Sequence, residues 1–366
     1  MIKVLVVDDS ALMRRLLANV LRSQDDFEVE VARDGVEGLA KLHAFQPDVV
    51  TLDIHMPNMD GLACLDRMMI ERPCRVIMVS SLTAEGADET FEAMQLGAID
   101  FIAKPRGAIS LAIDDLAPVL IDKVRAAARM RIRTTRGLTE RVRLRAAQSA
   151  GLAGAAANRP QVFSPAAVTP ELRAGPSDGV VLVGASTGGP PALDALLSPL
   201  PATFPWPILI AQHMPASFTG PLARRLDRLC ALSVEEVVRP SPLVPGRVYV
   251  GKGDADIIVV KRGDTAFVTA APSLAEHRWH PSVDRMVRTA IQIFGAERLI
   301  GVLLTGMGDD GATAMTQLRS EGGRTIAESE ETAVVWGMPG ELVKAGGAEV
   351  VAPLGKIATC LSGWAR

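Results

Sequence analysis

The chain has 366 residues, more than one ordinary domain accommodates, so we expect two domains. Its residues are 48% hydrophobic and 22% charged, a balance typical of a globular protein with enough apolar material for buried cores. The net charge of −3 argues against a protein that coats nucleic acid or an anionic membrane.

The start of the chain, MIKVLVVDDS, becomes acidic too early for a signal peptide, and no uncharged apolar run has the length of a membrane span. We therefore expect a cytoplasmic protein without direct membrane insertion. The cysteines lack the spacing of a metal site, which favours reduced and mostly buried thiols: Cys64, Cys74, Cys230 and Cys360.

Residues 1–122 alternate short apolar runs with stretches of helical periodicity, such as Leu12–Ser23. The expected strands are Lys3–Val7, Phe27–Ala32, Val49–Asp53, Arg75–Ser80 and Ile99–Ile102. This alternation predicts an α/β domain with a five-stranded parallel sheet covered by helices on both faces.

The composition changes in residues 123–176, which we interpret as a linker. Ten basic residues and one acidic residue, Glu140, lie between Lys123 and Arg159, and Ala, Gly and Pro dominate the rest. The start of this segment can continue the last helix of the first domain. A solvated, flexible linker is the favoured interpretation, and a patch for nucleic acid or an acidic partner is the alternative.

Strand-like runs resume in residues 177–366 and are separated by helical stretches. The expected strands are Gly179–Gly184, Pro207–Gln212, Arg247–Val250, Arg298–Thr305 and Gly323–Ala327. They predict a second α/β domain with a mostly parallel, doubly wound sheet.

Polar side chains follow the predicted strands of the first domain, at the edge where functional groups of such sheets gather. Asp8 and Asp9 follow the first strand, Asp53 ends the third, Ser80 ends the fourth and Lys104 follows the fifth. Three facing carboxylates repel one another, and a hard cation such as Mg²⁺ would relieve the repulsion. The lysine could neutralise a phosphoryl group added to a carboxylate, and the serine could hydrogen-bond it. The acidic pair alone also fits loop solvation or helix capping.

The combination DDS…LDIHMPNMDG…MVSS…AKP resembles the response-regulator receiver domain, which has a flavodoxin-like fold. The resemblance implies that Asp53 accepts the phosphoryl group and that Asp8, Asp9 and Asp53 hold Mg²⁺. It also implies that Ser80 is the switch hydroxyl and that Lys104 contacts the phosphoryl group.

Two further positions of the receiver pattern are less specific. Phe101 occupies the aromatic switch position, although a buried core aromatic fits equally well. His55 replaces an acidic residue two positions after Asp53. In the family this position gives the metal a backbone carbonyl, so the replacement changes little.

The most informative motif of the second domain is VVLVGASTGGPPALDALL, an apolar strand that leads into a helix opened by Pro190. Residues 184–188 fit G-x-S-x-G, a sharp strand-to-helix turn that exposes a serine nucleophile, here Ser186. The helix N-terminus offers backbone N–H groups to an oxyanion. A phosphate-binding turn or a plain tight turn fits the same pattern.

A base and an acid for Ser186 can be placed at the same sheet edge. His213 directly follows an apolar strand in ILIAQHMP and is the best candidate for the base. Asp309 and Asp310 follow another strand in LIGVLLTGMGDDGA and can supply the orienting acid. The order Ser, His, Asp along the chain differs from that of α/β-hydrolases.

Two alternative functions compete with a hydrolase. Residues 306–311 fit the dinucleotide fingerprint G-x-G-x-x-G, with Glu328 at a plausible distance, which suggests a nucleotide-binding output domain. However, the aspartates of this loop would repel a pyrophosphate, and the motif lies late in the domain. A DNA-binding regulator or adaptor that uses the basic linker is the other alternative, although no helix-turn-helix pattern follows the first domain.

The motifs GASTGGPPAL, AQHMP, HPSVDRM, LLTGMGDDGA and WGMPG, in this order behind a receiver, resemble the chemotaxis protein-glutamate methylesterase family, CheB. The resemblance covers nearly the whole chain except the linker. It implies that Ser186 is the nucleophile, His213 the base and Asp310 the acid, with Thr187 and Met307 beside the oxyanion.

The same resemblance implies the reaction and its partners. The family removes methyl groups from glutamate methyl esters on chemoreceptors, releasing methanol, and deamidates receptor glutamines. The implied partners are the histidine kinase of the chemotaxis pathway as phosphodonor and a methyl-accepting chemoreceptor as substrate, without nucleic acid. The esterase reaction itself needs no cofactor. We expect the unphosphorylated receiver to pack over the Ser186 edge and to exclude a helical substrate.

One stretch departs from the family pattern, which commonly reads His-Arg-Pro-Ser-Val-Asp. Residues 277–284 read His-Arg-Trp-His-Pro-Ser-Val-Asp, so the family histidine has no single counterpart. Substrate contacts near Trp279 and His280 are therefore left open. The predicted organisation is a receiver at 1–122, a linker at 123–176 and a methylesterase domain at 177–366.

Overall fold

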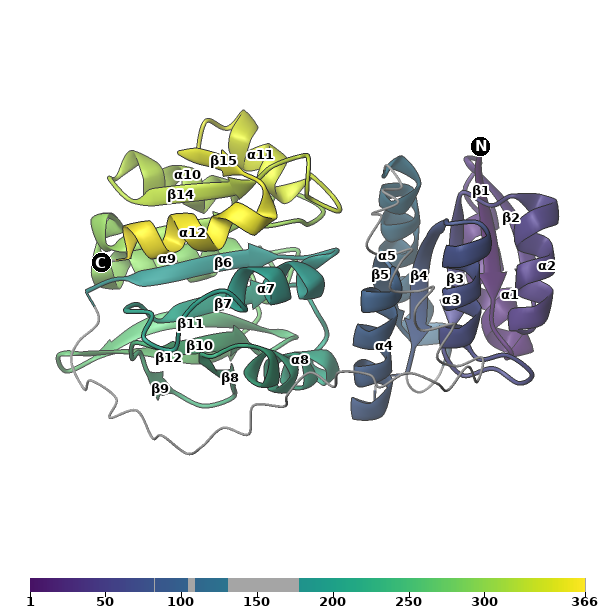
Figure 1. Cartoon of the computed structure of the whole chain (residues 1–366), viewed down its shortest axis with the longest axis horizontal. Coiled ribbons are helices and arrows are strands. Elements are labelled where there is room, and N and C mark those ends of the chain that lie inside the picture. Colours follow the sequence, from purple (N-terminus) through teal and green to yellow (C-terminus); the bar gives the residue numbers. More distant parts are fainter. Residues whose placement is uncertain (82, 105–108, 131–177, 366) are drawn as a thin grey trace, which may run out of the picture.

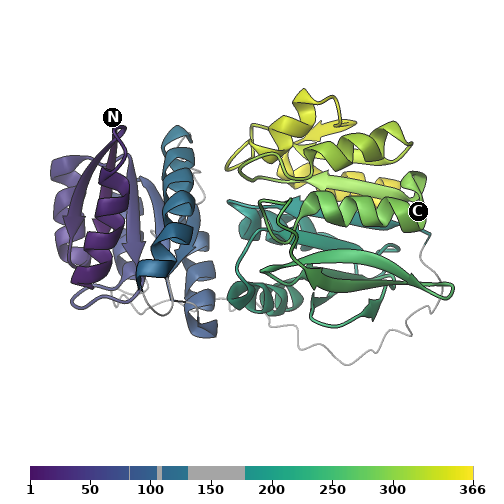
Figure 2. The ribbon, with the colours of Figure 1, turned by 180° about the vertical axis from the view of Figure 1, so that it is seen from behind.

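A computed structural model describes residues 1–81, 83–104, 109–130 and 178–365 (Figures 1 and 2). Residues 131–177, which form most of the predicted basic linker, lie outside the described residues, as does Pro105 of the AKP motif. Two α/β domains lie side by side.

The N-terminal domain is a five-stranded sheet in the order β2-β1-β3-β4-β5, and all its pairings are parallel. Its elements are β1 (Ile2–Val7), α1 (Ala11–Arg22), β2 (Phe27–Ala32), α2 (Gly35–Phe45), β3 (Val49–Asp53), α3 (Gly61–Glu71), β4 (Arg75–Ser80), α4 (Ala84–Leu96), β5 (Asp100–Ala103) and α5 (Ile109–Arg129).

Alternating residues of β1 explain why helices cover both faces of this sheet. Leu5 and Val7 belong to the apolar cluster that contains the buried side chains of α2, α3 and α4. Val4 and Val6 belong to a second cluster, with α1 and α5. The structure therefore confirms the predicted doubly covered parallel sheet.

The C-terminal domain contains a seven-stranded sheet in the order β15-β14-β13-β6-β7-β10-β8, with every pairing parallel. A three-stranded antiparallel sheet, β11-β12-β9, packs beside it. The elements are β6 (Val180–Ala185), α7 (Gly189–Leu197), β7 (Ile208–Gln212), α8 (Ala216–Leu229), β8 (Ser233–Val237), β9 (Ser241–Pro242), β10 (Arg247–Gly251), β11 (Ala255–Arg262), β12 (Thr265–Pro272), α9 (Val283–Phe294), the 3₁₀ turn η1 (Ala296–Arg298), β13 (Leu299–Leu303), α10 (Ala312–Ser320), β14 (Arg324–Glu328), α11 (Met338–Lys344), β15 (Val350–Ala352) and α12 (Leu354–Trp364).

Strand β6 shows the same alternation in this domain. Val181 and Val183 pack with the apolar side chains of α7, α8 and α12. Val180 and Leu182 pack with those of α9, α10 and α11 and with the small sheet. Because β13, β6 and β7 are neighbours and parallel, their carboxyl ends share one edge, where the predicted catalytic residues follow them.

Helix α4 of the N-terminal domain packs against α7 and α8 of the second domain, and Phe101 on β5 contacts α8 (Figures 1 and 2). The ring of Phe218 on α8 lies 4.3 Å from that of Phe101 and 6.4 Å from that of Phe91, measured between centroids. The apolar cluster of the α2–α4 side thus continues into the second domain without interruption.

Helix α5 continues to Arg129, seven residues beyond the boundary predicted at 122, and the boundaries at 122 and 176 remain predictions. Among the helices of the described ranges, none combines the length and the apolar character that crossing a bilayer requires.

Candidate active site and phosphorylation site

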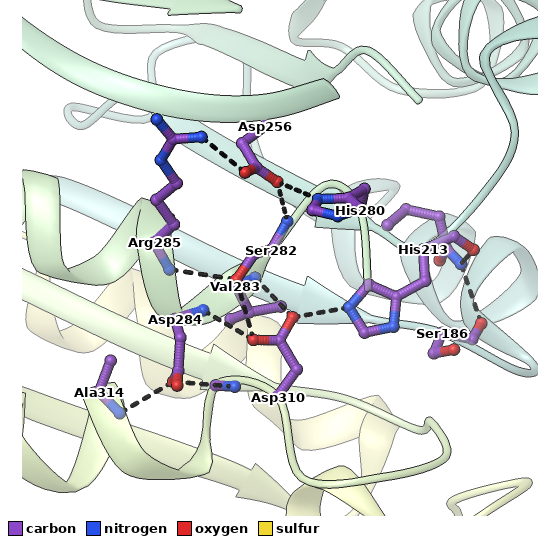
Figure 3. A network of polar contacts seen from close by, with 12 residues as sticks. Ser186, His213, Asp256, His280, Ser282, Val283, Asp284, Arg285, Asp310 and Ala314 are labelled. Atoms are coloured by element: carbon purple, nitrogen blue, oxygen red, sulfur yellow. Dashed lines mark hydrogen bonds and ion pairs between the residues drawn. The ribbon is translucent and has the colours of Figure 1, made fainter. Parts of the chain in front are cut away.

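Three strand ends bring the predicted catalytic residues together. Ser186 follows β6, His213 follows β7 and Asp310 lies in the loop between β13 and α10. His213 Nε2 lies 2.8 Å from Asp310 Oδ2, and Figure 3 shows Ser186 on the far side of the imidazole ring. The arrangement supports the proposed chemistry of a serine with a histidine base and an orienting acid.

The turn that carries Ser186 is tight, but the serine itself is not in the left-handed region. The positive φ, +76°, falls on Gly188, and a Cβ there would lie 2.6 Å from Cβ of Val334. The Ser186 N–H donates to Thr305 O at 3.0 Å, and the Ser186 carbonyl accepts from Gly189 N at 2.8 Å. This turn therefore needs a glycine at position 188, and the backbone of the nucleophile itself is unstrained.

His213 is fixed by its neighbours on several sides. Its backbone N–H donates to Ala185 O at 3.0 Å, and the side-chain amide of Gln212 donates both to its carbonyl and to that of Ser186. The indole of Trp279 stacks on the imidazole, with 5.6 Å between the centroids and 10° between the planes. Trp279, left open by the sequence, therefore covers one face of the histidine.

The two ring nitrogens of His213 have different surroundings. Because a carboxylate only accepts, Nε2 carries the proton that binds Asp310. Nδ1 is buried, has no hydrogen-bond partner among the described residues, and lies on the Ser186 side of the ring in Figure 3. Its lone pair is therefore the one available to a serine hydroxyl, whereas the chymotrypsin template uses Nε2 for this purpose.

Asp310 is held as an anion at the N-terminus of α9. Its carboxylate accepts from Val283 N at 2.7 Å, from Asp284 N at 3.0 Å and from the hydroxyl of Ser282 at 3.2 Å. Burial favours the neutral acid, but the bonds from His213 and from these backbone groups outweigh it and lower the pKa of Asp310. The lowered pKa favours the charged carboxylate of Asp310, which is the form that stabilises a protonated His213.

Thr187 and Met307, expected beside the oxyanion, lie next to the nucleophile. Thr187 opens the turn into α7, and Met307 follows Gly306, where an added Cβ would come within 2.8 Å of Cβ of Ser186. Within the described ranges, the backbone N–H groups of Thr187 and Met307 have no hydrogen-bond partner. Both are free to bind an oxyanion.

The loop at 306–311 does not have the properties of a dinucleotide site. Glu328, which would have bound a ribose, is fully buried and accepts from Thr305 N at 2.8 Å. Asp310 in the same loop faces His213. The side chains that a nucleotide would need are thus engaged within the protein.

His280 lies in a second carboxylate network that sequence reasoning did not find. Its Nδ1 binds the fully buried Asp256 at 2.8 Å, and the other oxygen of Asp256 accepts from Arg285 at 2.7 Å (Figure 3). Asp256 also accepts from Ser282 N at 2.8 Å. This network anchors the start of α9, the helix that binds Asp310.

The predicted phosphorylation site is assembled at the carboxyl edge of the receiver sheet. Carboxylate oxygens of Asp8, Asp9 and Asp53 lie within 4.8 Å of one another. Lys104 Nζ lies 2.7 Å from Asp53 and 3.2 Å from Asp8. Burial raises the pKa of Asp8 to about 6, with a further contribution from Asp53, and burial also raises that of Asp53. Such crowded acids fit a divalent cation with oxygen ligands.

The remaining receiver positions contact residues other than Asp53. Ser80 is buried and donates to the carbonyl of Gly86, in the first turn of α4, at 3.0 Å. Phe101 is buried against Phe218 of the second domain, so it is a core aromatic of the domain interface. His55 is exposed and pairs with Glu89 on α4 at 3.1 Å.

Polar contacts join the receiver to residues beside the nucleophile. The Thr187 hydroxyl donates to Asp100, the first residue of β5, and Lys123 on α5 pairs with the other oxygen of this carboxylate at 2.6 Å. Arg278, next to Trp279, pairs with Asp122 on α5. The receiver therefore lies directly against the neighbour of Ser186.

The sequence was compared with known proteins. The family model "CheB methylesterase" matches residues 181–361, and "Response regulator receiver domain" matches residues 4–113. Protein-glutamate methylesterase/protein-glutamine glutaminase 2 of Rhodopseudomonas palustris is 53% identical over 100% of this chain and 98% of its own. The chain belongs to the CheB methylesterase family.

Further CheB relatives match the whole chain or about half of it. Protein-glutamate methylesterase/protein-glutamine glutaminase 3 of Rhodospirillum rubrum is 52% identical over 100% of this chain and 96% of its own. The solved catalytic domain of the Thermotoga maritima CheB methylesterase is 38% identical over 50% of this chain and 97% of its own, with a TM-score of 0.49. Membership in the CheB family weighs against both alternatives, a nucleotide-binding output domain and a DNA-binding regulator.

Proposed function

We propose that this chain is a phosphorylation-controlled hydrolase that demethylates glutamate methyl esters on a chemoreceptor and deamidates receptor glutamines. The observation that carries the proposal is the edge formed by Ser186, His213 and Asp310 behind a receiver, in a chain of the CheB family. The relatives' names give both activities, and the His213–Asp310 contact beside Ser186 supports the proposed roles of base, acid and nucleophile.

Acylation uses the free nitrogen of His213. The hydroxyl oxygen of Ser186 attacks the ester carbonyl while Nδ1 of His213 takes the hydroxyl proton. Asp310 stabilises the resulting imidazolium. The backbone N–H groups of Thr187 and Met307 receive the oxyanion. The imidazolium then gives its proton to the departing methoxide, so methanol leaves and the glutamyl side chain remains esterified to Ser186.

Deacylation repeats these steps with water. His213 takes a proton from water, whose oxygen attacks the acyl group, and the proton returns to Ser186 as the glutamate carboxyl is released. A glutamine offers the same carbonyl with ammonia as the leaving group, so deamidation needs no additional residue.

Control begins at Asp53, which receives the phosphoryl group from the histidine kinase of the chemotaxis pathway. Asp8, Asp9 and Asp53 would hold Mg²⁺, which when bound offsets the negative charge gathered at this edge. Lys104, already paired with Asp53, would move its contact to the phosphoryl oxygens. Ser80 would leave the carbonyl of Gly86 for the same oxygens.

Strand β5 connects this site to the catalytic domain. Lys104 directly follows the strand, whereas Asp100 and Phe101 at its start contact Thr187 and Phe218. A displacement of Lys104 therefore acts on a strand that contacts the catalytic domain at the turn beside Ser186. In the resting state the receiver excludes a helical chemoreceptor segment from the Ser186 edge, and phosphorylation weakens that packing.

The assignment of Ser186 is tested by Ser186→Ala. Because the hydroxyl is the only group proposed to form the acyl-enzyme, methanol release from methylated receptor should fall at least about 10⁴-fold. The measurement compares methanol released with and without a phosphodonor.

Ser198→Ala is the matched control, since Ser198 caps the end of α7 on the surface and its hydroxyl has no partner other than Asp194 O among the described residues. Turnover close to wild type in Ser186→Ala, or an equal loss in Ser198→Ala, would contradict the assignment.

A further inference from the structure

Helices α9 and α10 begin beside each other, and backbone N–H groups at each helix start donate to an aspartate that lies at or just before the start of the other helix. Asp310, just before α10, accepts from Val283 N and Asp284 N in the first turn of α9. Asp284 in turn accepts through one oxygen from Gly311 N at 3.1 Å and from Ala314 N at 3.0 Å (Figure 3). The exchange is reciprocal, so the position of Asp310 depends on both helix starts.

The two helix starts also approach closely. Gly311 has a φ of +91°, and a Cβ there would lie 2.6 Å from Cγ1 of Val283. Gly311 and Ala314 are buried, so without Asp284 their N–H groups would lack both the carboxylate and ready access to water. The peptide that carries Asp310 is thus held by Asp284 on one side and by His213 on the other.

The pKa values of Asp284 and Asp310 are shifted in opposite directions, which suits a supporting role for Asp284. Burial, with Asp310 nearby, raises the pKa of Asp284, whereas the bonds from His213 and the backbone lower that of Asp310 despite burial. The positive ends of two helices stabilise both groups. A proton added to the pair therefore goes to Asp284 and leaves Asp310 as the anion that faces His213.

We propose that Asp284 is a positioning residue that fixes Asp310 against His213 by holding the first turn of α10. The inference rests on the proposed function, because Asp310 has its role in the esterase reaction. It gives a function to the aspartate of the HPSVD motif, which touches neither Ser186 nor His213 by any hydrogen bond of the described residues. Misplacing a catalytic group by about 1 Å can reduce turnover about 10²-fold.

The test uses the full chain with a phosphodonor and compares wild type with Asp284→Ala and Asp284→Asn. Two rates are measured: methanol release from methylated receptor, resolved into kcat and KM, and labelling of Ser186 by a fluorophosphonate. We expect Asp284→Ala to reduce kcat and the labelling rate by about 10- to 100-fold with KM within about threefold. Asp284→Asn should stay within about threefold of wild type, because its amide oxygen still accepts from both N–H groups.

The matched control is Asp227→Ala. Asp227 accepts from Val234 N near the start of β8, at the edge of the sheet opposite Ser186, so its loss disturbs folding without touching the site. In an Asp310→Ala background, Asp284→Ala should cause no further loss, because it acts only through Asp310.

Wild-type kcat in Asp284→Ala, equal losses in the Ala and Asn variants, or additive losses with Asp310→Ala would each overturn the inference. If Asp284→Ala does not fold, Asp284→Ser replaces it, and an unchanged kcat in that variant counts equally against the inference. A wild type that neither releases methanol nor reacts at Ser186 would instead overturn the proposed function itself.

Discussion

Two buried carboxyl groups near Ser186 have opposite pKa shifts, and the difference lies in their partners. Burial alone would raise the pKa of Asp310, but hydrogen bonds from the imidazole of His213 and from two backbone N–H groups stabilise its charged form, so its pKa is lowered. Glu328 is fully buried, and the N–H of Thr305 does not compensate for desolvation, so its pKa is raised. Asp310 is therefore suited to act as a permanent anion, whereas ionisation of Glu328 lowers the stability of the folded protein.

The raised pKa of Glu328 predicts that Glu328→Gln increases the stability of the folded protein in a pH-dependent way. The folded state binds the proton more tightly than the unfolded state, so wild type loses stability as pH rises from the unfolded pKa through the folded one. The variant has no such loss, and its midpoint of thermal unfolding should exceed that of wild type at pH 8 but not at pH 4. Each kcal/mol relieved corresponds to about 2–4 °C in a domain of this size.

Glu341→Gln is the control, because Glu341 lies on the surface in a pair with Lys344. Thermal unfolding at several pH values should show no pH-dependent difference for that variant. A gain in Glu328→Gln that is equal at pH 4 and pH 8 would contradict the assigned cause.

At the scale of elements, the turn from β6 into α7 depends on one glycine. Gly188 has a φ of +76° and packs against Val334, so Gly188→Ala combines an unfavourable backbone region with a steric clash. We expect a loss of about 2–4 kcal/mol in the free energy of unfolding. Activity should fall as well, because Thr187 and its N–H move with this turn.

Gly346→Ala separates the two causes. Gly346 also has a positive φ, +69°, but no atom of the described part of the chain lies within 4 Å of an added Cβ. Denaturant unfolding should therefore show a loss of only about 1–2 kcal/mol there, with unchanged methanol release. Equal losses at Gly188 and Gly346 would mean that the contact with Val334 is not responsible.

Strand ends were the part of the site that the sequence could predict. Each expected strand is present within two residues, because an apolar run that ends in a polar residue carries its own signal, as before Asp53, Ser186 and His213. Parallel pairing then places these residues at one edge. Strands β8, β9, β11, β12 and β15 were not predicted. Strands β8, β9 and β15 have short apolar runs, whereas β11 contains the apolar run Ile257–Val260.

The supporting contacts could not be predicted, because they join residues that are distant in the chain. Asp256 binds His280 24 residues away, and Asp284 binds Gly311 27 residues away. Ser282 before an apolar helical run does carry the signal of a helix N-cap, but that signal does not say which carboxylate the helix start will bind. The choice of ring nitrogen on His213 likewise depends on tertiary packing.

For the whole molecule, the important feature is that one apolar cluster and one carboxylate join the receiver to the nucleophile turn. Phe101 packs on Phe218, and Asp100 accepts from the Thr187 hydroxyl while it pairs with Lys123. The aromatic contact gives affinity between the domains, whereas the hydrogen bond fixes the receiver beside Ser186. A change at Asp53 must therefore weaken a small number of identifiable contacts.

Asp100→Ala should release part of this restraint. A hydrogen bond to a charged group contributes about 1.5–3 kcal/mol, so removing it shifts the balance between packed and separated domains by about tenfold or more. We expect methanol release without phosphodonor to rise several-fold, while the rate with phosphodonor stays unchanged because the catalytic residues are intact. Asp26→Ala is the control, since Asp26 pairs with Arg125 on the same helix as Lys123 but within the receiver alone. A rise in both variants would indicate general loosening of the receiver. No rise in Asp100→Ala would show that the other contacts between the domains, the aromatic packing and the Arg278–Asp122 pair, are enough to restrain the enzyme.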